Sequence, residues 1–88
     1  MKTTKQLERY FKGASNHGRL DILNLVNKND GMTLGEIAES LDRNIKTVSE
    51  HTHRLVHAGL LNKKYRGSEV THFLSPYGKK FIEFTKSF

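Results

Sequence analysis

The chain has 88 residues, no cysteine and a formal net charge of +6. Its length predicts one domain with a modest core, and the lack of cysteine excludes disulfides and thiolate metal sites. The polar segment 1–12 has no signal-peptide core, and no segment approaches the roughly 20 apolar residues of a membrane span. We therefore expect a cytoplasmic protein that does not enter a membrane, with a core completed by helix packing or by a partner subunit.

The positive charge is unevenly distributed along the chain. Residues 1–12 have a net charge of +3 and residues 43–73 one of +4, whereas residues 13–42 between them have a net charge of −3. Basic segments of this kind indicate an anionic partner, such as nucleic acid or a membrane surface. Solubilising charge on a small protein is the alternative.

In chain order, hydrophobic periodicity first predicts two helices. The first is capped by Thr3 or Thr4 and ends near residue 15, after Gly13 has weakened it. The second extends over about residues 18–28. The apolar stripe of the first helix consists of Leu7, Tyr10, Phe11 and Ala14.

A helix-turn-helix is predicted next. After a short extended link, Thr33 and Glu36 form the pattern of a capping box, which opens a helix of about eight residues. Asn44 can cap a fourth helix at 45–58, and Gly59 is suited to end it. The short connection between these helices is typical of a helix-turn-helix motif. In the fourth helix, the side chains expected to face the core are Ile45, Val48, Leu55 and Val56.

The hydrophobic period then changes from that of a helix to that of a strand. Residues 61–66 and 70–74 are predicted to form two strands joined by a turn at 67–68. Ser75-Pro76 then starts a last helix that ends near residue 87. The predicted fold is mainly α with a small β-hairpin (α+β). It is a winged helix-turn-helix with about five helices and a two-stranded wing.

The predicted motif and hairpin suit double-stranded DNA. A helix fits the major groove, where its exposed side chains can read base edges, and a basic hairpin beside it can reach the backbone or the minor groove. An ordinary solvated helix face is the alternative. The residues expected to contact DNA are Arg43, Asn44, Lys46, Thr47, Ser49, Glu50, His53, Arg54, Lys63, Lys64, Arg66 and Ser68.

Several segments carry a resemblance to a known family. Four of them resemble the second helix, the third helix, the recognition helix and its exit in ArsR-type winged-helix regulators: Gly18–Leu23, Thr33–Ala38, Thr47–His51 and Ala58–Leu61. The segment Ser75–Lys80 is closer to the region after the wing in MarR-like proteins. The resemblance covers about residues 7–82. It implies a dimeric, repressor-like DNA binder, which in some members responds to metal.

Two features depart from that family pattern. The cysteine pair that metal-sensing members often carry on the third helix is missing, and Glu50 stands where many members have Arg or Gln. A carboxylate can accept a hydrogen bond from cytosine N4, but it also repels phosphate. An ion pair within the helix, with Lys46 or Arg54, is the alternative for this side chain.

The remaining polar residues indicate neither catalysis nor a metal site. His53 and His57 have a spacing that could share a metal, but the pattern offers no third ligand, so we expect no metal and no cofactor. Ser49 and His51 point to different helix faces, and there is no phosphate-cradling loop. We therefore expect neither an enzyme nor a small-molecule ligand. His51 is instead expected to bond within the motif, and His53 to face phosphate.

The aromatic residues are concentrated in the two terminal helices, which hold six of the eight in the chain. A second copy of the chain packing against these helices would bury them, although they could instead cover their own core. The residues expected at a dimer interface are Leu7, Tyr10, Phe11, Phe81, Phe84 and Phe88. We thus expect one domain over residues 1–88 that reads an inverted repeat as a dimeric repressor. The alternatives are a protein-interaction module and a low-specificity, nucleoid-type DNA binder.

Overall fold

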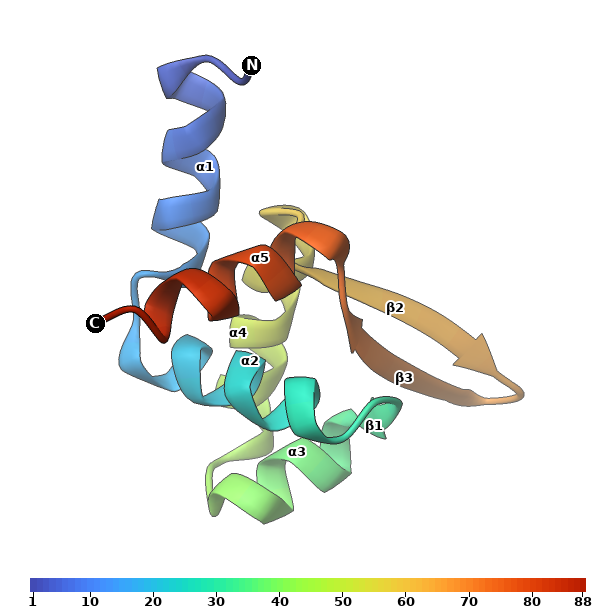
Figure 1. Cartoon of the computed structure of the whole chain (residues 1–88). Helices are drawn as coiled ribbons and strands as arrows, with labels where there is room; N and C mark the ends of the chain where they lie inside the picture. The colour runs from blue at the N-terminus through green and yellow to red at the C-terminus, as the bar shows by residue number, and fades with distance from the viewer.

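The computed structural model describes residues 1–88 and has the predicted order of helices and strands (Figure 1). Most bounds differ from the predicted ones by one or two residues, as helix ends generally do. No helix in it combines the length and the apolar character needed to cross a membrane. The elements are α1 (Thr4–Ala14), α2 (His17–Lys28), β1 (Met32–Thr33), α3 (Leu34–Leu41), α4 (Ile45–His57), β2 (Leu61–Arg66), β3 (Glu69–Leu74) and α5 (Pro76–Thr85).

The sheet has three antiparallel strands in the order β1-β3-β2, one more than predicted. The wing hairpin pairs β2 with β3 over their whole lengths, from Leu61 opposite Leu74 to Arg66 opposite Glu69. The extra strand is the expected extended link, in which Thr33 lies opposite Thr71. A two-residue strand has no periodicity of its own, so its pairing depends on contacts that the sequence pattern does not contain. Because β1 leads directly into α3, this pairing attaches the base of the wing to the helix-turn-helix.

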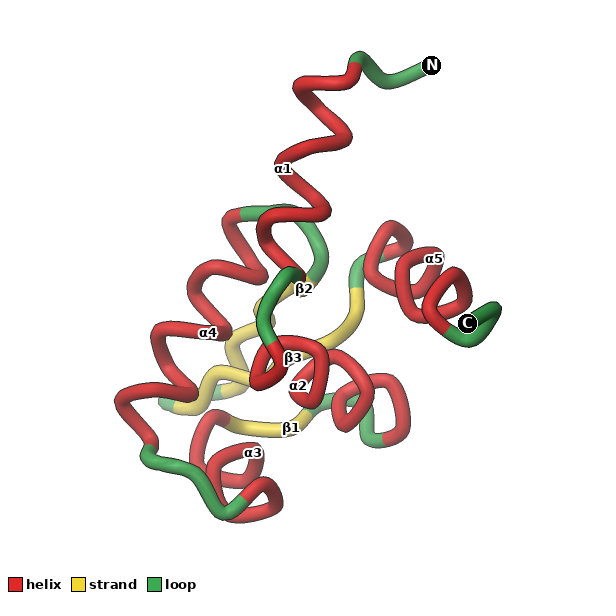
Figure 2. Tube along the Cα trace, turned by 90° about the vertical axis from the view of Figure 1, so that its left-hand side faces the viewer, coloured by secondary structure: helices red, strands yellow, loops and turns green.

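The hydrophobic core lies between the helices and the base of the sheet. Figure 2 shows α4 on one side of the molecule and α5 on the other, with α2 between them. Full burial of an apolar side chain of this size contributes roughly 1.5–3 kcal/mol, so this cluster holds the helix-turn-helix in shape. Its members are Ala14, Ile22, Leu23, Val26, Ile37, Ala38, Val48, Leu55, Ala58, Leu60, Leu61, Leu74 and Ile82.

Local caps set the starts of the two motif helices as predicted. Thr33 Oγ1 accepts from the Glu36 amide at 3.2 Å, and Glu36 Oε1 accepts from the Thr33 amide at 2.8 Å. The hydrogen bond from the Thr33 amide favours the ionised carboxylate and so lowers the pKa of Glu36. Asn44 caps α4 by accepting from the Lys46 amide at 2.8 Å. After α4, Gly59 takes a φ of +84°, which ends the helix.

The first helix projects from the body of the molecule (Figure 1), and Ala14 is its only buried residue. Its last turn packs closely on the end of α4, because a Cβ added at Gly13 would overlap the Cβ of Ala58. Gly13 was expected to weaken this helix, whereas it lies inside α1 and allows this close approach. An isolated helix of 11 residues is marginal in water, so α1 depends on tertiary contacts.

Candidate nucleic-acid interface

The outer side of α4 carries the polar side chains that the sequence predicts to contact DNA. Val48, Thr52 and Leu55 are buried on its inner side. Ile45, expected in the core, is instead 51% exposed, because the core contacts of α4 begin at Val48, beyond its first residue. The exposed side chains of the outer side are Lys46, Thr47, Ser49, Glu50, His53 and Arg54.

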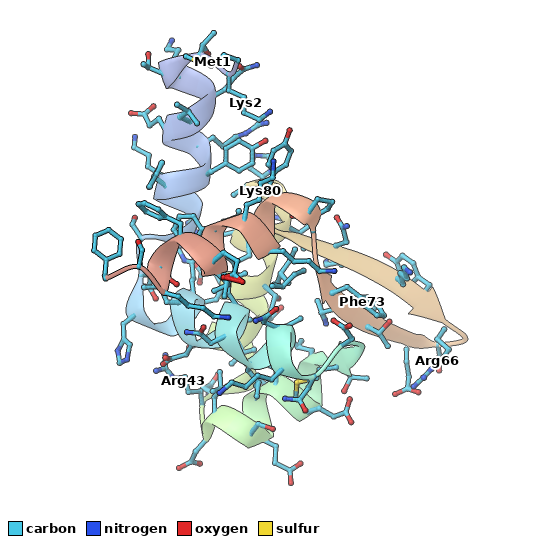
Figure 3. All side chains as sticks on the ribbon, viewed as in Figure 1. Met1, Lys2, Arg43, Arg66, Phe73 and Lys80 are labelled. Atoms are coloured by element: carbon cyan, nitrogen blue, oxygen red, sulfur yellow. The ribbon has the colours of Figure 1, made fainter.

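The wing carries exposed basic side chains along β2, and Lys63 is the one that lines a cavity with α4. Lys63, Lys64, Arg66 and the turn residue Ser68 are all exposed, and Figure 3 shows Arg66 at the far end of the wing. Arg66 Nη2 lies 3.8 Å from Glu69 Oε1, an exposed ion pair that contributes little and leaves the guanidinium free to bind elsewhere. Lys64 Nζ lies 4.8 Å from the centre of the Phe73 ring.

A cavity of about 450 Å³ separates α4 from the wing and brings predicted residues of both elements together. Its lining includes Lys46, Ser49, Glu50 and His53 from α4 and Lys63 from β2. Predicted side chains from two separate sequence segments, four from α4 and Lys63 from the wing, therefore line one polar surface, which we call the α4–wing face.

Two predicted contact residues have structural partners. Arg43 is half-buried and its Nη2 donates to Asp21 Oδ2 at 2.8 Å, which attaches the turn before α4 to α2. Asn44 uses its side chain as the cap of α4. An ion pair between residues 22 positions apart leaves no mark in local spacing, so the sequence pattern presented Arg43 as a free cation.

Glu50 has the ion pair that the sequence left open as one alternative. Its Oε1 lies 3.6 Å from Arg54 Nη2, four residues further along α4, and both side chains are mostly exposed. The pair balances the negative charge on the outer side of α4. The exposed geometry leaves Arg54 able to exchange this partner for another anion.

Arg19 of α2 is a positioning residue that sequence reasoning did not select. Its guanidinium donates to the carbonyl oxygens of Lys12 and Gly13, at 3.2 and 3.1 Å, and so satisfies the end of α1. Its Nε donates to His51 Nδ1 at 3.4 Å. His51, expected to bond within the motif, therefore bonds to α2 instead. Arg19 in this way connects α1, α2 and α4.

The environment of His51 predicts a pH-dependent stability. Burial, followed by the charges of Arg19 and Arg43, lowers the pKa of His51 below its usual value of 6.5. The unfolded chain therefore binds this proton more readily than the folded one. The stabilisation is complete above pH 6.5 and decreases as the pH falls through that value towards the lower folded pKa.

We expect His51→Asn, whose amide oxygen can still accept from Arg19, to lose part of the decrease in stability between pH 7.5 and 5.5. Urea unfolding of wild type and variant across this range measures the effect. His53→Asn, at an exposed position of the same helix, is the matched control and should retain the wild-type slope. Equal slopes in wild type and the His51 variant would contradict the assignment.

The terminal helices meet through their aromatic rings. The ring of Phe11 on α1 lies 5.7 Å from Phe81 and 6.2 Å from Phe84 on α5, and Tyr10 lies 5.2 Å from Tyr77. Tyr10 and Phe81 also pack on the core, which agrees with the alternative that these aromatic residues cover the core of their own chain. Several large apolar side chains of these helices remain exposed: Leu7 (42%), Phe11 (50%), Tyr77 (44%), Phe84 (47%) and Phe88 (91%). We call this exposed set the terminal aromatic face.

Charged side chains border this face at one end. Lys2 Nζ lies 4.5 Å from the centre of the Tyr77 ring and 5.3 Å from that of Tyr10. Figure 3 shows Lys2 and Lys80 at this end, between α1 and α5. No group of three or more His, Asp or Glu side chains is arranged to hold a metal ion anywhere in the structure.

Comparisons with known proteins agree on the fold. The family described as HVO_A0114 matches residues 16–79. Reduced HlyU from Vibrio cholerae is 27% identical with a TM-score of 0.82, and the match covers 92% of this chain and 85% of that one. The homodimeric winged helix-turn-helix DNA-binding domain of Mb0332 from Mycobacterium bovis, a possible ArsR-family regulator, is 21% identical with a TM-score of 0.86. The match covers 96% of this chain and 78% of that one.

NolR from Sinorhizobium fredii is 18% identical with a TM-score of 0.85, covering 96% of this chain and 84% of that one. No curated protein sequence matches the chain. These solved structures confirm the predicted winged helix-turn-helix fold.

Proposed function

This chain belongs to the HVO_A0114 family, and from that premise and its winged helix-turn-helix fold we propose that it is a transcription regulator that binds double-stranded DNA. Residues 1–88 act as a single DNA-binding domain. As a homodimeric repressor, it reads an inverted repeat through α4, with the wing on the DNA backbone. The observation that carries this proposal is the α4–wing face, where hydrogen-bonding side chains of a recognition helix adjoin Lys63 of the hairpin.

The chemistry of this face suits DNA. Lys46, Thr47 and Ser49 lie in the first half of α4, the part of a recognition helix that reaches base edges in the major groove. Lys63, Lys64 and Arg66 lie on the adjoining strand, where each can neutralise a phosphate. Arg43 and Asn44 support this surface by fixing the start of α4. No side chain on this face is assigned a catalytic role, and we propose no enzymatic activity, metal or cofactor.

The exposure of the terminal aromatic face supports a homodimer that forms through it. Leu7, Phe11, Phe84 and Phe88 present contiguous apolar surface from α1 and α5, which the monomer leaves uncovered. Two-fold symmetry through these helices would present two copies of α4 to successive major grooves, about 34 Å apart. The homodimeric state of the Mb0332 domain supports this arrangement.

The direct test compares DNA fragments of equal length. The affinity for the promoter region of the protein's own gene should be higher than that for an unrelated duplex by about 10³-fold or more. The affinity for a specific site typically exceeds that for a non-specific one by at least this ratio. Fluorescence anisotropy at fixed salt measures both affinities. Equal affinities would favour a nucleoid-type binder, and binding to neither duplex would contradict the proposal.

A protein-interaction module is the second candidate, favoured by the exposed apolar side chains of Ile45 and Tyr65.

Substitutions should separate the roles of helix and wing. Lys64→Ala or Arg66→Ala removes a phosphate contact and should weaken binding to all duplexes alike. Lys46→Ala or Thr47→Ala should instead change the preference among sequences, by roughly 1–3 kcal/mol at one base pair. Binding to a panel of single-base operator variants measures the difference. If only the wing variants alter the preference, α4 is not the reading element.

A further inference from the structure

The flank of α4 that faces α1 carries a second cationic surface, separate from the wing. It borders a cavity of about 520 Å³ between these two helices and the start of α2. Its basic lining residues are Arg9 and Lys12 from α1, Arg19 from α2 and Arg54 from α4, and His53 and His57 lie beside them. We call this surface the α1–α4 cleft. None of the residues from α1 and α2 was selected as a candidate site from the sequence.

The charges across this cleft are unbalanced. Glu50 is its only acidic lining residue, and it is paired with Arg54. Lys12 has an exposed ion pair with Glu8, whereas Arg9 has no acidic partner in the structure. Like charges presented by two packed helices repel one another unless an anion lies between them. The free chain therefore presents a site whose electrostatics favour a bound anion.

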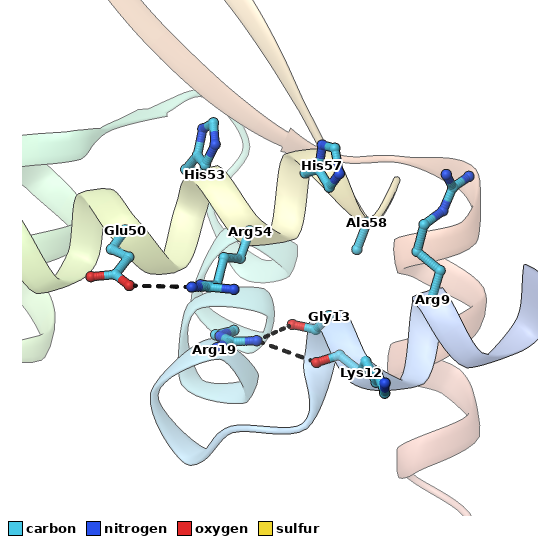
Figure 4. A pocket seen from close by; sticks show the side chains of 9 residues that line it. All are labelled: Arg9, Lys12, Gly13, Arg19, Glu50, His53, Arg54, His57 and Ala58. Carbon is cyan, nitrogen blue, oxygen red and sulfur yellow. Dashed lines mark hydrogen bonds and ion pairs between the residues drawn. The ribbon is translucent and has the colours of Figure 1, made fainter.

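The position of α1 is set by contacts at the floor of the cleft. Figure 4 shows the cationic side chains around the contact between Gly13 and Ala58, with Arg19 donating to the carbonyl oxygens of Lys12 and Gly13. This close contact leaves little freedom for α1 to move relative to α4. The backbone that carries the cations of α1 is therefore positioned before any ligand arrives, which reduces the entropy cost of binding.

The cleft is continuous with the α4–wing face. Glu50 and His53 line both this cleft and the cavity on the wing side of α4, so the two surfaces meet along the outer side of one helix. A duplex that follows α4 in the major groove passes from one surface to the other. We propose that the α1–α4 cleft binds backbone phosphates of the same DNA, through Arg9 and Lys12, on the side of α4 opposite the wing.

This inference rests on the proposed DNA binding and extends it to a helix otherwise assigned to dimerisation. It implies that α1 has two roles on different sides. The terminal aromatic face holds the partner copy, and the cationic side contacts the phosphates that lie between the two half-sites. The dimer would then engage a duplex with three elements from each chain, which are the wing, α4 and α1.

The test measures how the affinity of the full-length dimer for its promoter duplex depends on salt. Each phosphate contact contributes about 0.9 to the slope of log K against log salt concentration. Arg9→Ala/Lys12→Ala removes two cations per chain, or four per dimer, so its slope should be smaller by about 3 to 4. Its loss of affinity between 50 and 200 mM salt should then be about 100-fold smaller than that of the wild type.

Two controls make the result specific. Lys28→Ala/Lys79→Ala removes the same charge at exposed positions that line no cavity and form no ion pair, and should keep the wild-type slope. Arg9→Lys/Lys12→Arg keeps the charge and should also keep the slope. Circular dichroism confirms that each variant is folded.

The outcomes separate this inference from the proposed function. A wild type that does not bind DNA contradicts the proposed function itself. A wild type with a steep slope that Arg9→Ala/Lys12→Ala leaves unchanged overturns the cleft alone. Calorimetric titration of the DNA-free protein with inorganic tripolyphosphate provides the last arm. Saturable micromolar binding that the double variant loses, together with a DNA salt slope that the double variant leaves unchanged, would assign the cleft to a free anion and overturn the assignment to DNA.

Discussion

Raising the salt concentration from 50 to 200 mM is expected to weaken the binding of this protein to its promoter duplex by about 10³-fold or more. The reason is the release of counterions, which accompanies each phosphate that a basic side chain neutralises. The outer side of α4 and the wing offer Lys46, Arg54, Lys63, Lys64 and Arg66 in each chain, all exposed. A dimer therefore has enough cations for roughly six to ten phosphate contacts.

The measurement is an anisotropy titration at four or more salt concentrations with one duplex. Lys63→Ala/Lys64→Ala removes two cations of the wing and should reduce the slope of log K against log salt concentration, whereas Lys28→Ala should not. A flat response in the wild type would exclude the α4–wing face as the main DNA surface. It would favour a protein-interaction module, in which the exposed apolar side chains of Ile45 and Tyr65 contact a protein partner.

The fold was predictable from the sequence where local interactions set the structure. Thr33 with Glu36, Asn44 and Ser75 were each expected to start a helix, and each accepts the predicted kind of backbone hydrogen bond. The hairpin was predictable because two segments with the two-residue period of a strand flank a turn. In this turn Gly67 takes a positive φ of 64°. These determinants lie within a few residues of one another, so they are visible in spacing alone.

The features that the sequence did not predict depend on residues far apart in the chain. The pairing of β1 with β3 joins residues 40 positions apart, as does the hydrogen bond between His72 Nδ1 and the Met32 carbonyl oxygen. The sequence pattern predicted Arg43 to be a free cation, whereas in the fold it forms an ion pair with Asp21. Ile45 fitted an apolar helix face, but the first residue of α4 lies outside the core.

The candidate site shows the same division. The outer residues of α4 and the wing cations were predictable, because helical and strand periods place them on exposed faces. The α1–α4 cleft was not, since it requires knowing that the small residues Gly13 and Ala58 bring two helices into contact. The net charge of +3 in residues 1–12 was the one local sign of it. The fold is needed to show that two of these cations, Arg9 and Lys12, lie beside α4.

Phe84→Glu is expected to convert the proposed homodimer into a folded monomer with far weaker DNA binding. The side chain is 47% exposed, and its ring lies within 5.1 to 6.3 Å of the rings of Phe88, Phe11 and Phe81. A carboxylate there would have to be desolvated against the partner's apolar surface, which costs free energy that the apolar contact of Phe84 does not. Since the side chain is half exposed in the single chain, the monomer can keep the carboxylate in water and remain folded.

The loss of DNA affinity should be large, because two linked half-sites bind about 10² to 10⁴ times more tightly than one. Sedimentation velocity, circular dichroism and anisotropy with one full operator measure assembly, folding and binding separately. Phe84→Leu keeps the apolar contact and should leave all three unchanged. An unfolded Phe84→Glu variant would show that Phe84 belongs to the chain's own core. A wild type that is monomeric at about 100 μM would contradict the dimer outright, since a functional interface should be occupied at that concentration.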